Sequence, residues 1–146
     1  MRAYNSYIAD DCRPWAGRLF PVGFISLADV GEAVREVRRC VEELGMIGLH
    51  LPPSLPVPHP AAPDAFPAVR LPKHLSHADF HPILAAAAEL DVAVGVHGSP
   101  GVYMPSGIAE QVDTFILSHI FGHRNQMQMA LATSVFTEHM AYVAAT

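Results

Sequence analysis

The sequence is poor in cysteine and in charged residues, and it has no long apolar run. Cys12 and Cys40 are its only cysteines, and their spacing is not that of a metal-binding cluster. Unpaired thiols are typical of reducing compartments, so we expect a cytoplasmic protein. No run of about 18 apolar residues is present, and no segment is therefore expected to span a membrane. The first residues lack the apolar core of a signal peptide, and we expect none.

Positive charge is scarce as well. The chain has 9 lysines and arginines against 14 aspartates and glutamates, which gives a formal net charge of −5. This balance gives no electrostatic reason to bind nucleic acid or an anionic membrane. What the sequence does have is apolar character, at 51% of its 146 residues. That is enough for a core, and we predict a single domain over residues 1–146.

Segments typical of strands and helices alternate along the chain. Strands are predicted at residues 19–26, 46–51 and 92–97, each bounded by Gly, Pro, Asp or Ser. Helices are predicted at residues 5–12, 29–44, 79–90 and 108–140, the last of them bent near Gly122 into two. This alternation indicates parallel βαβ units, and the predicted class is α/β.

The helix at residues 29–44 has the clearest pattern. Asp29 is a capping residue, and Glu32 three positions later completes a capping box. An apolar stripe at helical spacing should pack against the core, and it consists of Val30, Val34, Val37, Val41 and Leu44. The charged residues between them are expected on the solvent side, namely Arg35, Glu36, Arg38, Arg39, Glu42 and Glu43.

Residues 54–78 are rich in proline up to Pro72. Prolines disrupt both helices and central strands, so we predict a loop insertion here and no folded unit. Asp79 and Pro82 then mark the start of the next helix, with Asp79 as its cap.

The strand at residues 92–97 is predicted to be buried, parallel and two-faced. Side chains alternate along a strand, so the three valines share one face, and Ala93, Gly95 and His97 share the other. The strand at residues 46–51 repeats this Gly-x-His pattern with Gly48 and His50. Catalytic groups of parallel barrels lie at the C-terminal ends of the strands, which is where His97 is expected.

Other histidines are weaker candidates. His119 and His123 are four apart and share a helix face, but Ile120 stands where a zinc protease has its glutamate. We predict that they line a pocket rim, as we do for His50. A chance group of histidines in a polar segment accounts for His74, His77 and His81.

Several segments together carry a family resemblance. They are Tyr4-Asn5, R-L-F-P-V-G-F-I-S at residues 18–26, E-E-L-G at 42–45, M-I-G-L-H-L-P-P at 46–53, D-F-H-P-I-L-A-A-A-A-E-L at 79–90 and V-A-V-G-V-H-G at 92–98. Over about residues 4 to 130, the chain resembles the amidohydrolase superfamily, in the branch that includes aminocarboxymuconate-semialdehyde decarboxylase.

The resemblance implies part of a metal-dependent enzyme. Such proteins are (β/α)₈ barrels of about 250 residues or more, so this chain would supply about three strands with their helices. It implies His97 as a ligand of a divalent metal, zinc by expectation. The family's His-x-His pair is missing here, and its late metal-binding aspartate would lie beyond Thr146. The implied activity is hydrolysis or decarboxylation of a small organic acid or cyclic substrate.

Two alternatives stay open. The chain could be a non-catalytic truncated α/β module that forms homo-oligomers through the open edges of an incomplete barrel. It could also hold a metal by itself, with His50, His97, His119 and His123 as ligands.

Overall fold

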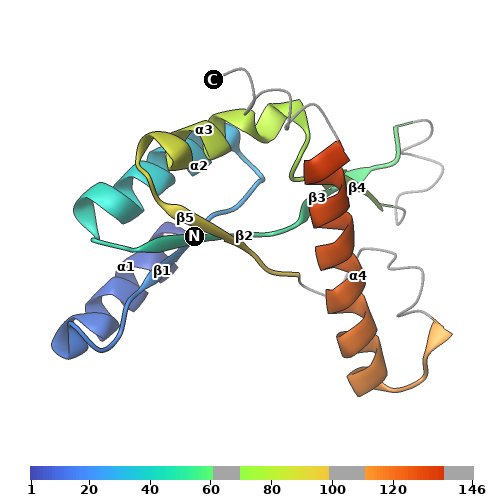
Figure 1. The fold of residues 1–146 in the computed structure, drawn as a ribbon, viewed down its shortest axis with the longest axis horizontal. Helices are drawn as coiled ribbons and strands as arrows, with labels where there is room; N and C mark the ends of the chain where they lie inside the picture. Colours follow the sequence, from blue (N-terminus) through green and yellow to red (C-terminus); the bar gives the residue numbers. More distant parts are fainter. Residues whose placement is uncertain (61–69, 99–110, 137–146) are drawn as a thin grey trace. The chain divides into compact units, whose positions relative to one another are not determined.

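The computed structural model describes residues 1–60, 70–98 and 111–136 (Figure 1). The chain divides into two compact units, and each is described by itself. The first unit comprises Met1–Leu51 and Asp79–Val96, and the second comprises Pro52–Ala78 and His97–Thr146. None of the helices in the described residues is both long enough and apolar enough to cross a membrane.

The first unit contains a parallel sheet of three strands in the order β1-β2-β5. They are β1 (Val22–Phe24), β2 (Gly48–Leu51) and β5 (Ala93–Val96). Phe24 pairs with His50, and His50 pairs with Gly95, so these three residues form one row across the sheet. The predicted parallel βαβ arrangement is confirmed.

β1 is shorter than the predicted strand at residues 19–26. Pro21 has no N–H to donate to the sheet, and Leu19 and Phe20 before it are exposed. The Pro21 carbonyl still accepts a hydrogen bond from Ile47 N at 3.3 Å. The ladder therefore begins at Val22, one residue after the proline.

Helices cover one face of this sheet (Figure 1). α2 (Val30–Arg38) and α3 (His81–Glu89) pack against each other, and Leu49 and Leu51 of β2 are buried beneath them. Gly23 of β1 also points to this side, because a Cβ there would lie 2.7 Å from Cys40 Sγ. By alternation, Val22, Phe24 and His50 point to the opposite face.

α2 begins as predicted, whereas α3 does not. The Asp29 side chain accepts a hydrogen bond from Glu32 N at 2.8 Å and caps α2. A 3₁₀ turn over Ala78–Phe80 precedes α3, whose capping residue is Phe80 and not Asp79. Pro82 occupies the first turn of α3, where its missing N–H costs no hydrogen bond.

α1 (Arg2–Cys12) is hydrogen-bonded to the edge of β1 through the side chain of Asn5. Asn5 Nδ2 donates to the Phe24 carbonyl at 2.9 Å, and Asn5 Oδ1 accepts from Phe24 N at 2.8 Å. These two backbone groups point away from β2, where a further strand would bond them. The Asn5 amide therefore closes this edge of the sheet. A 3₁₀ turn over Arg13–Trp15 follows α1.

Glu36 and Arg39 extend this contact into α2, which corrects the prediction that both lie on the solvent side. Their exposed fractions are only 2% and 7%. Arg39 donates to both Glu36 oxygens, at 2.7 and 2.8 Å, and also to Ser6 Oγ and the Arg2 carbonyl. Glu36 Oε1 also accepts from Asn5 Nδ2 at 2.8 Å. The hydrogen bond from Arg39 lowers the pKa of Glu36, against burial, and the bond from Asn5 lowers it further.

The burial of Glu36 and Arg39 has a physical reason. α2 and the π-helical turn after it (Arg39–Glu43) contact α1 as well as the sheet and α3, so the buried sector is wider than one apolar stripe. Val30 and Val34 of that stripe are only half-buried. Burying a charged pair is tolerated here because each charge has its counter-charge and further hydrogen bonds.

The second unit contains an antiparallel strand pair where a loop was predicted. β3 (Ser54–Pro58) pairs with β4 (Arg70–His74), and Pro56 lies opposite Pro72. Leu75 N donates to the Pro53 carbonyl at 2.9 Å, so alternation makes the Pro56–Pro72 pair a non-hydrogen-bonded one. Neither proline needs an N–H at such a position. The prediction failed because it treated every proline as a strand breaker.

The last described element, α4 (Phe115–Phe136), is a single helix. It runs through Gly122, where two helices and a bend were predicted. A glycine inside a helix costs only about 1 kcal/mol relative to alanine, which the rest of a 22-residue helix can offset. The predicted residues 108–110 and 137–140 lie outside the described part of the chain.

Replacing Asn5 tests the connection between α1, β1 and α2. Asn5→Ala removes the three hydrogen bonds that the buried Asn5 side chain makes with Phe24 and Glu36, and we expect it to lower the free energy of unfolding by about 2–4 kcal/mol. Asp10→Ala is the matched control on α1, because it removes an exposed ion pair with Arg13 that contributes less than about 1 kcal/mol. Urea denaturation measures both, and equal losses would contradict the proposed importance of Asn5.

The two cysteines should differ in reactivity. Burial, with a contribution from the Glu36 charge, raises the pKa of Cys40 to about 11, whereas Cys12 is partly exposed. Only the thiolate attacks disulfide reagents, so at pH 8 we expect one fast-reacting thiol, with the second reacting after unfolding. Cys12→Ser should abolish the fast phase, and two equally fast thiols would show that Cys40 is not buried.

Candidate functional site

The open face of the sheet carries His50. Its ring lies 5.3 Å from that of Phe24, centroid to centroid, at an interplanar angle of 75°. The ring of Tyr4 of α1 also contacts Phe24, with the ring centroids 6.4 Å apart and an interplanar angle of 83°. Together with Met1 and Val22, these three side chains line a pocket of about 520 Å³ within the first unit. His50 therefore lies at the wall of this pocket.

Sequence reasoning missed the aromatic walls of this pocket. Phe24 could have been found from the sequence, because strand alternation puts Val22 and Phe24 on the same face of β1. Tyr4 had no such signal, since it reaches the pocket only through the way α1 packs on β1.

His97 directly follows β5 and is exposed. β5 itself was predicted to be buried, but Ala93, Val94 and Gly95 are exposed. Within the described residues β5 pairs only with β2, so it is an edge strand with no neighbour to cover its outer side. The prediction of a buried strand did not take this missing neighbour into account.

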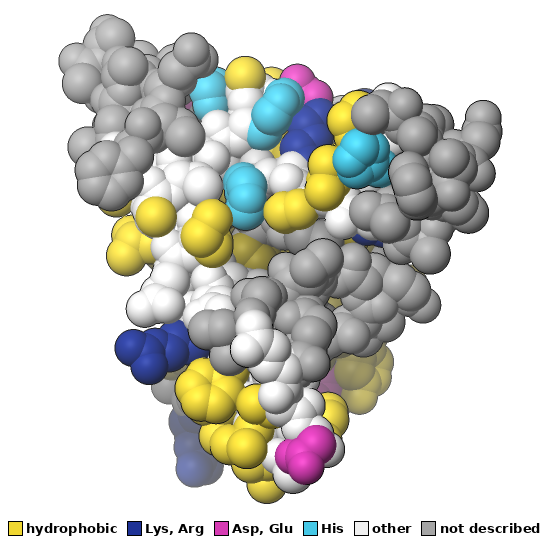
Figure 2. Space-filling model, turned by 90° about the vertical axis from the view of Figure 1, so that its right-hand side faces the viewer, with side chains coloured by type: hydrophobic (Ala, Val, Ile, Leu, Met, Phe, Trp, Pro, Cys, Tyr) yellow, Lys and Arg dark blue, Asp and Glu magenta, His cyan; other side chains and the backbone are white. Residues whose placement is uncertain are grey.

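His97 belongs to a group of three histidines in the second unit. Its ring centroid is 4.8 Å from that of His123, which is 4.4 Å from that of His119 one turn earlier on α4. Phe115 stacks on His119 at 5.5 Å. Desolvation lowers the pKa of His123, and the two neighbouring histidines lower it further, so all three causes favour its neutral form. Figure 2 shows histidine side chains among hydrophobic ones on one face of the surface.

The structure does not complete a metal site from these residues. Within residues 1–60, 70–98 and 111–136, no group of three or more His, Cys, Asp or Glu side chains is arranged to hold a metal ion. A catalytic zinc usually has three protein ligands, so the described residues alone do not form a catalytic metal centre.

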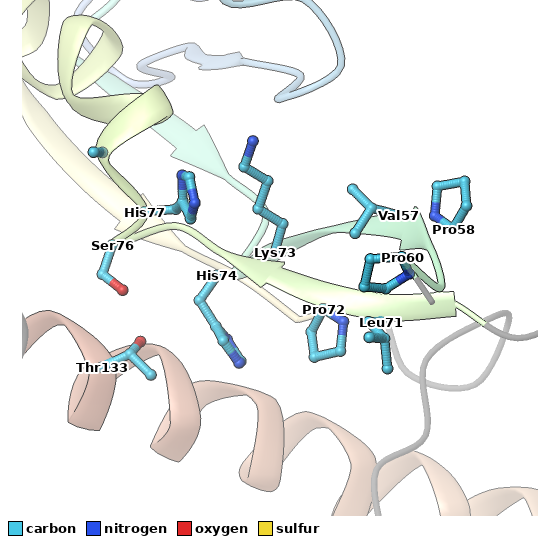
Figure 3. Close-up of a pocket in the computed structure, with 11 residues that line it drawn as sticks. Val57, Pro58, Pro60, Leu71, Pro72, Lys73, His74, Ser76, His77 and Thr133 are labelled. Atoms are coloured by element: carbon cyan, nitrogen blue, oxygen red, sulfur yellow. The ribbon is translucent and has the colours of Figure 1, made fainter. Parts of the chain in front are cut away.

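A second pocket lies in the segment predicted as a loop. It has a volume of about 770 Å³, and its wall is formed by the β3–β4 pair, the residues after it and Thr133 of α4. In Figure 3 the His74 side chain points toward α4, whereas Lys73 points to the other side of β4. Burial lowers the pKa of His74. His74 and His77 thus line a pocket, although sequence reasoning had treated them as a chance group.

Gly98 lies close against two side chains of α4. A Cβ at Gly98 would lie 2.7 Å from Gln126 Oε1 and 3.1 Å from His123 Nδ1. We expect Gly98→Ala to displace the His123 ring and to shift its NMR resonances. Gly95→Ala is the control, because its Cβ would meet only the Leu49 carbonyl, at an ordinary 3.6 Å. Unchanged His123 resonances in Gly98→Ala would contradict this packing.

Solved structures share this fold. The 5-carboxyvanillate decarboxylase of Novosphingobium aromaticivorans, determined with bound manganese and 3-methoxy-4-hydroxy-5-nitrobenzoic acid, is 23% identical with a TM-score of 0.68. The superposition covers 92% of this chain and 34% of that one. A 2,6-dihydroxybenzoate decarboxylase complexed with 2,6-dihydroxybenzoate, and one from Rhizobium, are each 19% identical with a TM-score of 0.68. Both superpositions cover 94% of this chain and 41% of the other.

These likenesses establish the fold. The chain spans 34% to 41% of the length of the solved structures, and its three parallel strands with their helices form part of a TIM-type barrel. A comparison with curated proteins gave no match. A family model described as amidohydrolase matches residues 1–140, almost the whole sequence. The chain therefore belongs to the amidohydrolase family.

Proposed function

We propose that this chain is a section of a metal-dependent decarboxylase or hydrolase that acts on a small organic acid or a cyclic substrate. The observation that carries the proposal is the row Phe24–His50–Gly95 on the face of a parallel sheet opposite α2 and α3, with His97 two residues beyond Gly95. Family membership and the barrel fold support it. The solved relatives named as decarboxylases of aromatic acids favour decarboxylation over hydrolysis.

The proposed metal ligand is His97, at the C-terminal end of β5, where barrel enzymes carry their catalytic groups. The other ligands would come from parts of a longer protein that this chain does not include. A divalent ion fits an imidazole ligand, and the manganese of one relative makes zinc one choice among others. His119 and His123 are proposed as neighbours at the pocket rim, because their rings lie next to that of His97 in the second unit.

Three further expectations belong to the same proposal. Residues 1–146 would form a single, incomplete barrel domain. The protein would act in the cytoplasm, which the two free cysteines support. Its partner would be a small molecule, and the net charge of −5 supports neither nucleic acid nor an anionic membrane as a partner.

A second candidate function is favoured by the exposure of β5. An exposed edge strand offers unpaired backbone groups to another chain, so a truncated module would self-associate through it. This candidate involves no catalysis by the chain.

The coding sequence on both sides distinguishes the two candidates. The enzyme proposal predicts a strand with His-x-His upstream and a strand ending in aspartate downstream. In the protein that includes them, His97→Ala should remove bound metal and lower activity by about 100-fold or more, whereas His77→Ala should leave both near wild type.

Stop codons on both sides would contradict the enzyme proposal. The 146-residue chain should then sediment as a dimer or larger assembly, as the second candidate requires. A compact monomer lacking these flanks would contradict both candidates.

A further inference from the structure

The strand edges of the two sheets differ in how they are protected. An open edge offers unpaired N–H and C=O groups to other chains, and proteins usually block such edges. The described residues contain two edges in each sheet, at β1 and β5 in the first unit and at β3 and β4 in the second. The edges of β1, β3 and β4 carry a blocking device, whereas that of β5 does not. This difference indicates the edge at which the chain can pair with another molecule.

The edge of β1 is blocked at Phe24 by the side chain of Asn5. Its Oδ1 accepts a hydrogen bond from Phe24 N at 2.8 Å, and its Nδ2 donates to the Phe24 carbonyl at 2.9 Å. The same Nδ2 also donates to Glu36 Oε1 at 2.8 Å, and the whole Asn5 side chain is buried. A strand that paired with β1 here would have to displace the amide and break these three hydrogen bonds.

Prolines blunt both edges of the β3–β4 pair. Pro56 and Pro72 form a non-hydrogen-bonded pair, and two residues further along the ladder Pro58 and Arg70 form another. The backbone groups at such positions are directed to the outer sides of the two strands. Pro56, Pro58 and Pro72 therefore remove outward N–H groups that these edges would otherwise offer, which is how proline is used on natural edge strands.

β5 has no comparable protection. Its sequence, A-V-G-V at residues 93–96, contains neither a proline nor a charged side chain. Ala93, Val94 and Gly95 are exposed, and in the described part of the chain β5 pairs with β2 alone. Short apolar edges without such devices are the ones that pair with other strands.

The backbone groups of Val94 are the ones directed to the open side of β5. Ile25 N donates to the His50 carbonyl, so the backbone groups of His50 are directed to β1. Because this direction alternates along a strand, the groups of Leu49 are directed to β5, where Val94 lies opposite Leu49. In a parallel ladder a residue bonds the two neighbours of the residue opposite it, so Ala93 and Gly95 face β2. Val94 therefore faces outward.

A second copy of this chain fits the edge of β5. A two-fold axis perpendicular to the sheet places two β5 strands antiparallel, and each outward donor then meets an acceptor of the other copy. The absence of charge in β5 avoids like-charge repulsion between the two strands. A strand of four residues offers few hydrogen bonds, so the pair should be weak and depend on protein concentration.

We propose that the chain self-associates through β5 alone, and that the Asn5 amide, by blocking β1, makes this association stop at a dimer. If both edges of the sheet could pair, each copy would bind two others, and the assembly would be open-ended. The proposal rests on the second candidate function, and it names the partner, the strand and the limit of that self-association.

Amide hydrogen exchange in the 146-residue chain tests the proposal without any substitution, when NMR follows it from about 10 μM to about 1 mM protein. Exchange at Val94 N–H should slow as dimers form, by about tenfold when about nine chains in ten are paired. Exchange at Phe24 N–H should be slow at every concentration, because Asn5 already holds it. Val94 exchange that stays constant while dimers form, or Phe24 exchange that slows with it, would overturn the proposal.

Substitution of Val94 locates the contact. Val94→Pro removes the outward N–H and keeps the inward hydrogen bonds of β5, so it should weaken dimerisation by about tenfold or more. Val94→Ala is the matched control, because it shortens the same side chain and keeps the N–H, and it should dimerise within about twofold of wild type. Sedimentation equilibrium measures both. Equal dimerisation of Val94→Pro and wild type would overturn the assignment to β5.

Substitution of Asn5 tests the limit at two copies. Asn5→Ala opens the edge of β1, and we expect assemblies larger than dimers. Combining it with Val94→Pro should return dimers, because only the edge of β1 is then open. A folded Asn5→Ala that stays dimeric would overturn the role of Asn5, with far-UV circular dichroism as the check of folding. If Asn5→Ala does not fold, exchange at Phe24 N–H in the wild type decides the same point.

Failure of this proposal is distinguishable from failure of the second candidate function. Self-association that Val94→Pro does not weaken would retain the second candidate and reject β5 as its edge. A wild-type chain that remains monomeric at about 1 mM would reject both.

Discussion

The buried ion pair between Glu36 and Arg39, joined to Asn5, is the interaction on which the first unit depends. It connects α1, α2 and the edge of β1 through one set of hydrogen bonds. Because Asn5 satisfies both backbone groups of Phe24, β1 needs no further strand at that residue. Removing any member would leave a buried charge or backbone group without its partner, which costs more than the pair itself contributes. The pocket wall formed by Tyr4 follows from this anchoring of α1.

The two faces of the sheet explain where chemistry can occur. One face is filled by Leu49, Leu51 and the helices that cover them, so it serves stability. The other carries Phe24 and His50 with Gly95 in the same row, and Gly48 and Ala93 in the row of Val22, so it leaves room for a ligand. This division is a consequence of strand alternation, and it was visible in the sequence as the Gly-x-His pattern at Gly48–His50.

Patterns that depend on local spacing could be predicted, and those that depend on distant packing could not. The parallel βαβ units follow from the alternation of strand and helix patterns, and the cap at Asp29 follows from local chemistry. The burial of Glu36 and Arg39 could not, because it depends on α1 arriving from a position more than 30 residues away in the sequence. The β3–β4 pair was missed because the pairing of Pro56 with Pro72 is a relation between two segments. The exposure of β5 reflects which strands are its neighbours, and the sequence of β5 carries no information on that.

The most direct test of the account is the side of the sheet on which the His50 ring lies, measured by nuclear Overhauser effects in the isotope-labelled chain. The account predicts contacts between the rings of His50 and Phe24 and between the rings of Phe24 and Tyr4. It predicts no contact from the His50 ring to Cys40. Contacts from His50 to Cys40 or Val37, on the helix-covered side, would contradict it.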